Sequence, residues 1–117
     1  MNNSGRLAEL KAADYLIRHR YKILDYNYKS RFGEIDIIAK KGKYIVFCEV
    51  KMRDTDSIAK PMEFVDESKQ AKIIATAQLY LAANPTNLQP RFDVIEVFMQ
   101  NGSIKSIKAL ENAFQLV

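Results

Sequence analysis

Apolar residues of the first segment of the chain recur with the period of an α-helix. They lie between residues 4 and 19 and are Leu7, Leu10, Ala13, Leu16 and Ile17. This spacing predicts a helix over residues 4–19 that turns the stripe toward a core. Residues 66–83 repeat the helical period and end at Asn84-Pro85, where proline cannot continue a helix.

Between and after these helices, the chain has short runs rich in β-branched and aromatic residues, which predict strands. The expected strands cover residues 21–28, 34–39, 44–51, 92–99 and 103–108. Gly42 marks a hairpin turn within residues 40–43, and Asn101-Gly102 marks a second one. The polar stretch 52–62 predicts a loop, and residues 109–115 predict a last helical turn or two.

The element order α-β-β-β-α-β-β, with an optional last helix, indicates an α/β fold. The helix between the third and fourth strands permits a parallel crossover. We therefore expect a central mixed β-sheet of about five strands flanked by helices. The length of 117 residues suits a single domain over residues 1–117.

Composition narrows the class of protein. Hydrophobic residues make up 48% of the chain and charged residues 27%, as in a globular protein. Cys48 and His19 are the single residues of their kinds, which excludes an internal disulfide and a structural zinc site. No apolar run approaches the ~20 residues of a membrane span, and the start does not resemble a signal peptide. These features predict a reduced, cytoplasmic setting and no membrane.

Positive charge is concentrated in the first half of the chain. The formal net charge is +4, and residues 1–60 hold 13 Lys and Arg against 8 Asp and Glu. Residues 61–117 hold 5 against 6. A basic half favours an anionic partner such as nucleic acid. A lysine-rich solvated surface is the alternative.

The second and third strands carry the charged residues of interest. Side chains alternate faces along a strand, so Glu34 and Asp36 share one face, as do Glu49 and Lys51. If paired residue numbers sum to 85, Asp36 faces Glu49 and Glu34 faces Lys51. A sum of 83 leaves Asp36 diagonal to Glu49, whereas a sum of 84 separates them unless a bulge intervenes.

Two adjacent carboxylates repel each other unless a cation lies between them. Mg²⁺ prefers oxygen ligands, which Asp36, Glu49 and the backbone carbonyl of Val50 would supply. The ammonium of Lys51 would orient a water or stabilise developing negative charge. The pattern therefore predicts metal-assisted hydrolysis of phosphodiesters. Exposed strand charges and a solvated ion pair are the alternative, although the third strand is nearly all apolar around Glu49.

The residues Gly33-Glu34-Ile35-Asp36, followed by Phe47-Cys48-Glu49-Val50-Lys51 and Arg53, resemble the core of the YraN-type family. That family is similar to the PD-(D/E)xK superfamily, whose fold is restriction-endonuclease-like and includes archaeal Holliday-junction resolvases. The resemblance covers nearly the whole chain, with further matches at Asn27, Lys69 and Arg91-Phe92-Asp93. Cys48 departs from the usual valine, on the face opposite Glu49.

The resemblance implies a role for each matching residue. Asp36 and Glu49 would bind Mg²⁺ or Mn²⁺, and Lys51 would be the catalytic lysine. Glu9 resembles an extra acidic residue of the junction resolvases, with a contact to the helix dipole as its alternative. The supporting or nucleic-acid-contacting residues would be Glu34, Arg53 and Lys69, although Lys69 also suits a plain helix surface. Junction resolvases are dimers, which implies a homodimer here.

Other polar residues have simpler interpretations. His19 is expected at the surface, Cys48 in the core, and Arg91 with Asp93 in a structural ion pair.

The leading hypothesis is a Mg²⁺- or Mn²⁺-dependent nuclease acting on DNA, with DNA favoured over RNA, on branched or processed ends. A nucleic-acid-binding module without catalysis and a structural or adaptor protein are the rivals.

Overall fold

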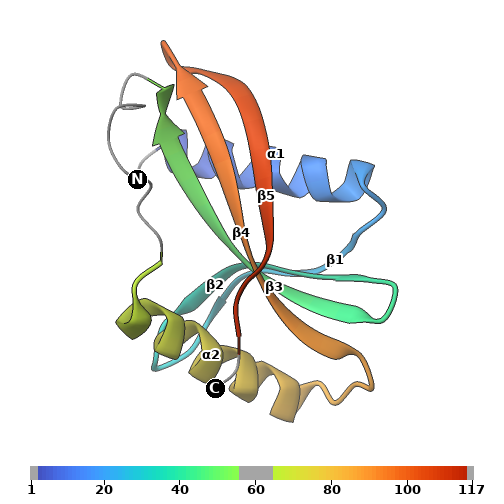
Figure 1. Cartoon of the computed structure of the whole chain (residues 1–117). Coiled ribbons are helices and arrows are strands. Elements are labelled where there is room, and N and C mark those ends of the chain that lie inside the picture. The colour runs from blue at the N-terminus through green and yellow to red at the C-terminus, as the bar shows by residue number, and fades with distance from the viewer. Residues whose placement is uncertain (1–2, 56–64, 116–117) are drawn as a thin grey trace.

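A twisted five-stranded sheet lies between two helices in the computed structural model of the chain, which describes residues 3–55 and 65–115 (Figure 1). The elements are α1 (Asn3–Arg18), β1 (Lys22–Lys29), β2 (Glu34–Lys41), β3 (Tyr44–Asp54), α2 (Glu67–Ala83), β4 (Gln89–Gln100) and β5 (Ser103–Phe114). The strand order is β1-β2-β3-β4-β5. β3 and β4 pair in parallel, and the other neighbouring pairs are antiparallel. The α/β fold with a mixed sheet and a crossover through α2 is thereby confirmed.

Both predicted hairpin turns are confirmed. Lys41 pairs with Tyr44, and Gly42 between them has φ +56°. Asn101 and Gly102 have φ values of +52° and +78° between β4 and β5. Positive φ at Gly42 in the first turn, and at both central residues in the second, matches the right-handed twist of the strands, and glycine and asparagine adopt it at lower cost than most residues.

Helix α2 packs on one face of the sheet, and its ends are capped. The Asp66 side chain accepts a hydrogen bond from the Lys69 backbone N–H at 2.8 Å, and the Asn84 N–H closes the last turn on the Tyr80 carbonyl. The buried residues of this layer include Ile38, Phe47, Ile73, Tyr80 and Phe92. Neither described helix combines the length and the apolar character needed to cross a membrane.

Helix α1 covers the opposite face, but not with the stripe that its apolar period predicts. Leu10 is 59% exposed, and Leu7 and Ile17 are also exposed. The buried side of the helix consists of Ala8, Ala12, Ala13 and Leu16. Three alanines let the helix backbone approach the sheet closely, which directs the larger side chains outward. The prediction of the helix was therefore confirmed, whereas its buried face was largely wrong.

The C-terminal part of the described chain is a strand rather than the predicted helical turn or two over residues 109–115. β5 continues to Phe114, whose buried ring stacks on Phe92 with 5.1 Å between ring centroids. The Asn112 backbone N–H donates to Asp93 at 3.0 Å, so the end of β5 is fixed to β4. Met52–Asp54 of the predicted loop likewise belong to β3, and residues 56–62 of that loop lie outside the described residues.

Three simpler expectations are confirmed. Arg91 donates two hydrogen bonds to Asp93, at 2.9 and 2.8 Å, and a third to the Tyr21 hydroxyl at 2.8 Å. These contacts form a nearly buried structural ion pair. Cys48 is buried in the layer under α1, and His19 is exposed beyond the end of that helix.

Candidate metal centre

The sheet opens between β2 and β3 where the candidate residues lie. These strands pair from Lys41 and Tyr44 to Ile37 and Cys48, so the paired numbers sum to 85, one of the registers that the pattern allows. β2 then continues along β1 and β3 along β4. Figure 1 shows β3 leaving β2 and rising beside β4. We call this divergence the fork. It removes the predicted pairing of Glu34 with Lys51, because the strands have separated before those positions.

Asp36 is the first residue of β2 beyond the last pair of the ladder, and its side chain spans the fork. Its Oδ2 accepts a hydrogen bond from the Val50 backbone N–H at 2.7 Å. A carboxylate thus takes the place of the next ladder bond. The N–H and C=O of a strand residue point to the same edge of the strand. The carbonyl of Val50 therefore also faces the fork, as its predicted role as a ligand requires.

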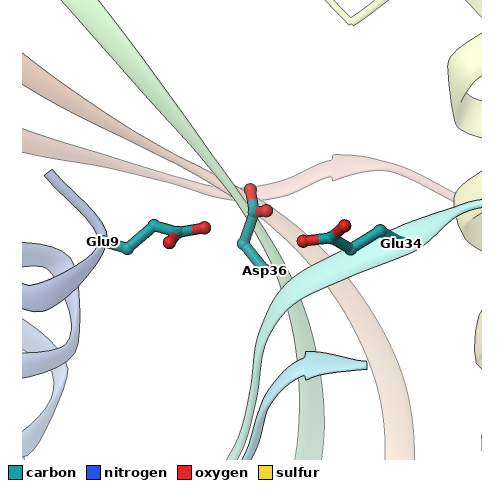
Figure 2. Close-up of side chains that lie close together, drawn as sticks. All are labelled: Glu9, Glu34 and Asp36. Atoms are coloured by element: carbon teal, nitrogen blue, oxygen red, sulfur yellow. The ribbon is translucent and has the colours of Figure 1, made fainter. Parts of the chain in front are cut away.

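Three carboxylates from two elements meet at the fork. Figure 2 shows Glu9 of α1 and Glu34 of β2 on either side of Asp36, and one oxygen of each lies within 4.8 Å of the others. We call these residues the acidic trio. Glu9 lies beyond the first turn of α1, so the alternative role at the helix dipole is wrong. The second-strand residues and Glu9 are thus brought together as the resemblance implied.

Asn27 of β1 holds two members of the trio. With its side-chain amide turned so that the nitrogen faces the carboxylates, Asn27 donates to Glu9 at 3.1 Å and to Glu34 at 2.9 Å, an orientation that the two carboxylates require. Its backbone has φ +51°, a left-handed conformation inside a strand that asparagine tolerates better than most residues. Sequence reasoning noted Asn27 only as a family match. A single Asn in a polar strand gives no signal of a bridging amide.

The electrostatics of Asp36 indicate a site that favours a cation. Burial is the largest cause that raises its pKa, and the charge of Glu49 is the next. The Val50 N–H opposes them, while Glu9 and Glu34 add to the rise, and the result is a pKa of about 8. Oxygen donors that repel one another in a partly buried place suit a hard divalent cation. The donor set therefore fits Mg²⁺ or Mn²⁺.

Glu49 lies at the fork on β3 and is only 6% exposed. Its Oε1 accepts a hydrogen bond from the ammonium of Lys69, at the start of α2. Burial alone would lower the pKa of Lys69, but the contact with Glu49 raises it above its ordinary value. Lys69 is therefore the counterion of a buried carboxylate rather than a plain surface lysine.

One groove of about 690 Å³ connects the acidic trio with Glu49 and Val50 of β3. It contains all four carboxylates, and its lining consists of Gly5, Arg6, Ala8, Glu9, Leu10, Tyr26, Asn27, Lys29, Glu34, Asp36, Glu49, Val50 and Met52. Of the remaining candidates, Lys51 is half-buried two residues beyond Glu49, and Arg53 donates to Glu96 at 3.1 Å. Among the described residues, Lys51, Arg53 and Lys69 do not line the groove. Their predicted roles at a substrate stay predictions.

Replacing Lys69 by methionine is expected to lower the free energy of unfolding by about 2 kcal/mol without metal, because Glu49 keeps its buried charge and loses its donor. Mn²⁺ should recover part of the loss by supplying the missing positive charge. Urea denaturation with EDTA or Mn²⁺ measures both effects. Lys72→Met, at an exposed position of the same helix, is the matched control. Equal stability of the two variants would contradict the assigned role of Lys69.

The fold and the fork define an α/β protein with a carboxylate site where a mixed sheet divides. Residues 8–97 match the model of the uncharacterised protein family UPF0102. A UPF0102 protein of Clostridium tetani is 46% identical over 114 residues, which are 96% of this chain and 93% of that protein. Another, from Caldanaerobacter subterraneus, is 43% identical over 113 residues, 94% and 93% of the two chains. The chain belongs to UPF0102, which is the YraN-type family.

Proposed function

We propose that the protein is a nuclease that hydrolyses phosphodiester bonds of DNA with Mg²⁺ or Mn²⁺. The observation that carries this proposal is the fork, where Asp36 and Glu49 enter one groove from two diverging strands. A ladder that continued past Ile37 would have filled this space with backbone hydrogen bonds. Its opening leaves a concave acidic site with the Val50 carbonyl at its edge.

The cation would be held by Asp36, Glu49 and the Val50 carbonyl. When bound, it would supply Lewis-acid activation of the phosphodiester and of the attacking water. Glu9 and Glu34, which are fixed by Asn27, stand beside Asp36 and suit the orientation of a water. The Val50 N–H fixes the Asp36 carboxylate, so this ligand would need little rearrangement on binding.

Lys51 is the proposed stabiliser of negative charge on the phosphate. It shares with Glu49 one face of β3, two residues farther along the strand. The described residues form no ion pair with Lys51. Its charge is therefore not already neutralised by one of their carboxylates. The basic first half of the chain supports an anionic polymer as substrate.

Calorimetric titration with Mn²⁺ tests the metal site directly. The wild type is expected to bind Mn²⁺, and the Asp36→Ala, Glu49→Ala double variant is expected to lose binding. Asp14→Ala is the matched control, because Asp14 is an exposed carboxylate of α1 paired with Arg18. Binding that persists in the double variant, or that Asp14→Ala also removes, would contradict the assigned ligands. DNA binding without cleavage at either metal would instead indicate a binding module.

A further inference from the structure

The groove beside the acidic trio has an apolar wall that the hydrolytic chemistry does not require. Tyr26 of β1 is 50% exposed, and its side chain lines the groove. Leu10 of α1 and Met52 of β3 are also exposed and line it. Three elements that are distant in sequence thus place large apolar side chains at one concave surface, next to carboxylates. Scattered exposed apolar residues are ordinary, but their convergence in one groove is informative.

Two cations line the same groove. Arg6 comes from α1 and Lys29 from the end of β1, and both are exposed. The groove is therefore lined by two cations, by apolar and aromatic side chains and by four carboxylates. A nucleic-acid strand offers anionic phosphates for the cations and flat bases for the apolar and aromatic side chains. An apolar peptide would match the wall but would leave the two cations and the carboxylates without partners.

We propose that this groove holds an unpaired segment of a nucleic-acid strand, with one base stacked on Tyr26 and its flanking phosphates on Arg6 and Lys29. The proposal rests on the nuclease function and names its substrate class. A base inside a duplex has both faces covered by its neighbours and cannot stack on a side chain. Stacking on an aromatic ring is tolerant of sequence, because every base has a flat face. A single exposed tyrosine would therefore bind a base without selecting which one. Leu10 and Met52 would contact the same nucleotide from the other elements.

The geometry also connects the stacked base to the reacting groups. Tyr26 lines the same groove as Glu9, Glu34 and Asp36. A base on Tyr26 would thus bring its own backbone close to the acidic trio. The protein would then cleave next to unpaired nucleotides, such as those at a flap, a gap or a frayed end.

Fluorescence anisotropy with a fluorescein-labelled single-stranded oligonucleotide, in EDTA to prevent cleavage, tests the inference. The wild type should bind the single strand more tightly than a hairpin duplex of the same composition. Tyr26→Ala should weaken single-strand binding by about tenfold, and Tyr26→Phe should retain it, because the ring stacks without its hydroxyl. Leu79→Ala is the matched control, since Leu79 is an exposed apolar residue of α2 outside the groove. Equal binding of both oligonucleotides, or no loss in Tyr26→Ala, would overturn the inference.

Salt dependence tests the two cations separately. Replacing Arg6 and Lys29 by glutamine should reduce the slope of log affinity against log salt by about 0.7 for each phosphate that is no longer neutralised. An unchanged slope would contradict the pairing of these cations with phosphates. Cleavage with Mn²⁺ separates this inference from the nuclease proposal. Cleavage that is unchanged in Tyr26→Ala and equal on single-stranded and duplex DNA would contradict the proposed binding of an unpaired strand in the groove, but not the nuclease proposal. Tyr26-dependent binding without cleavage would support the groove and refute the nuclease.

Discussion

Asp36→Asn is expected to lose metal-dependent cleavage by more than about 100-fold, while the metal-free protein becomes more stable. The amide keeps the size of the side chain and an oxygen that can accept the Val50 N–H. It loses the negative charge that a hard cation requires. The same change removes the repulsion that Asp36 experiences from Glu49, Glu9 and Glu34. Function and stability should therefore move in opposite directions.

The pH dependence follows from the pKa of Asp36, which is about 8 in the fold against an ordinary value of 3.8. Below about pH 4, the carboxyl is protonated in both the folded and the unfolded chain, so its ionisation does not change the free energy of unfolding. As the pH rises toward 8, it ionises first in the unfolded chain, which favours unfolding. The wild type should therefore lose stability across this interval without metal, and the loss should level off above about pH 8.

Thermal unfolding from pH 4 to 9 in EDTA checks the stability, and cleavage of a labelled DNA substrate with Mn²⁺ checks the activity. The pH-dependent loss should be reduced in Asp36→Asn and in the wild type with Mn²⁺. Asp14→Asn is the control, because it removes an exposed carboxylate and should alter neither property appreciably. Retained cleavage in Asp36→Asn would remove Asp36 from the metal ligands, whatever its effect on stability.

Arg53→Met is expected to lower the free energy of unfolding by about 3–5 kcal/mol, since it leaves a buried carboxylate without its cation. Glu96 is fully buried on β4, and its Oε2 accepts from Arg53 at 3.1 Å. The loss would be a large share of the stability of an ordinary domain. The pair also joins β3 to β4 just beyond the fork. Its removal should thus loosen the strand that carries Glu49.

Chemical denaturation of a double-mutant cycle measures this contribution. Combining Arg53→Met with Glu96→Gln should recover much of the loss, because the neutral amide tolerates burial better than an unpaired charge. Arg18→Met is the matched control. Arg18 forms an ion pair with Asp14 at 3.1 Å, but both side chains are exposed. Arg18→Met should therefore lower the free energy of unfolding by less than about 1 kcal/mol. Equal costs for Arg53→Met and Arg18→Met would contradict the importance of burial.

Local patterns in the sequence were sufficient for the elements and the register near the turn. Gly42 and Asn101-Gly102 determine two-residue turns, and the turn of the first hairpin aligns Ile37 with Cys48. The pattern failed where packing decides. Leu10 belongs to the helical apolar stripe, yet the neighbouring alanines allow closer contact with the sheet. The second half of the last strand was missed because Phe114 and Asp93, which hold it in place, act across strands.

In the candidate site, too, local patterns predicted some of the contacts, whereas others depend on how distant elements pack. Alternation along β2 and β3 was enough to expect Asp36 near Glu49, and the family resemblance added Glu9. Neither could show that Lys69 would reach Glu49 from α2, since that contact depends on the crossover. Tyr26 was likewise not distinguished from the other tyrosines, because only the fold places it in the groove.

The fork also has a consequence for the order of folding. Every described residue that lines the groove lies between Gly5 and Met52. The arm of β3 that carries Glu49 and Met52, however, pairs with β4, on the far side of α2 in the chain. Hairpins form from neighbouring segments, whereas a parallel pair must close a long loop and so forms late. A nascent chain would therefore contain the four carboxylates of the groove before β4 is available to fix the arm of β3 that carries Glu49. The proposed metal site in the first half of the chain would form only after the second half has folded.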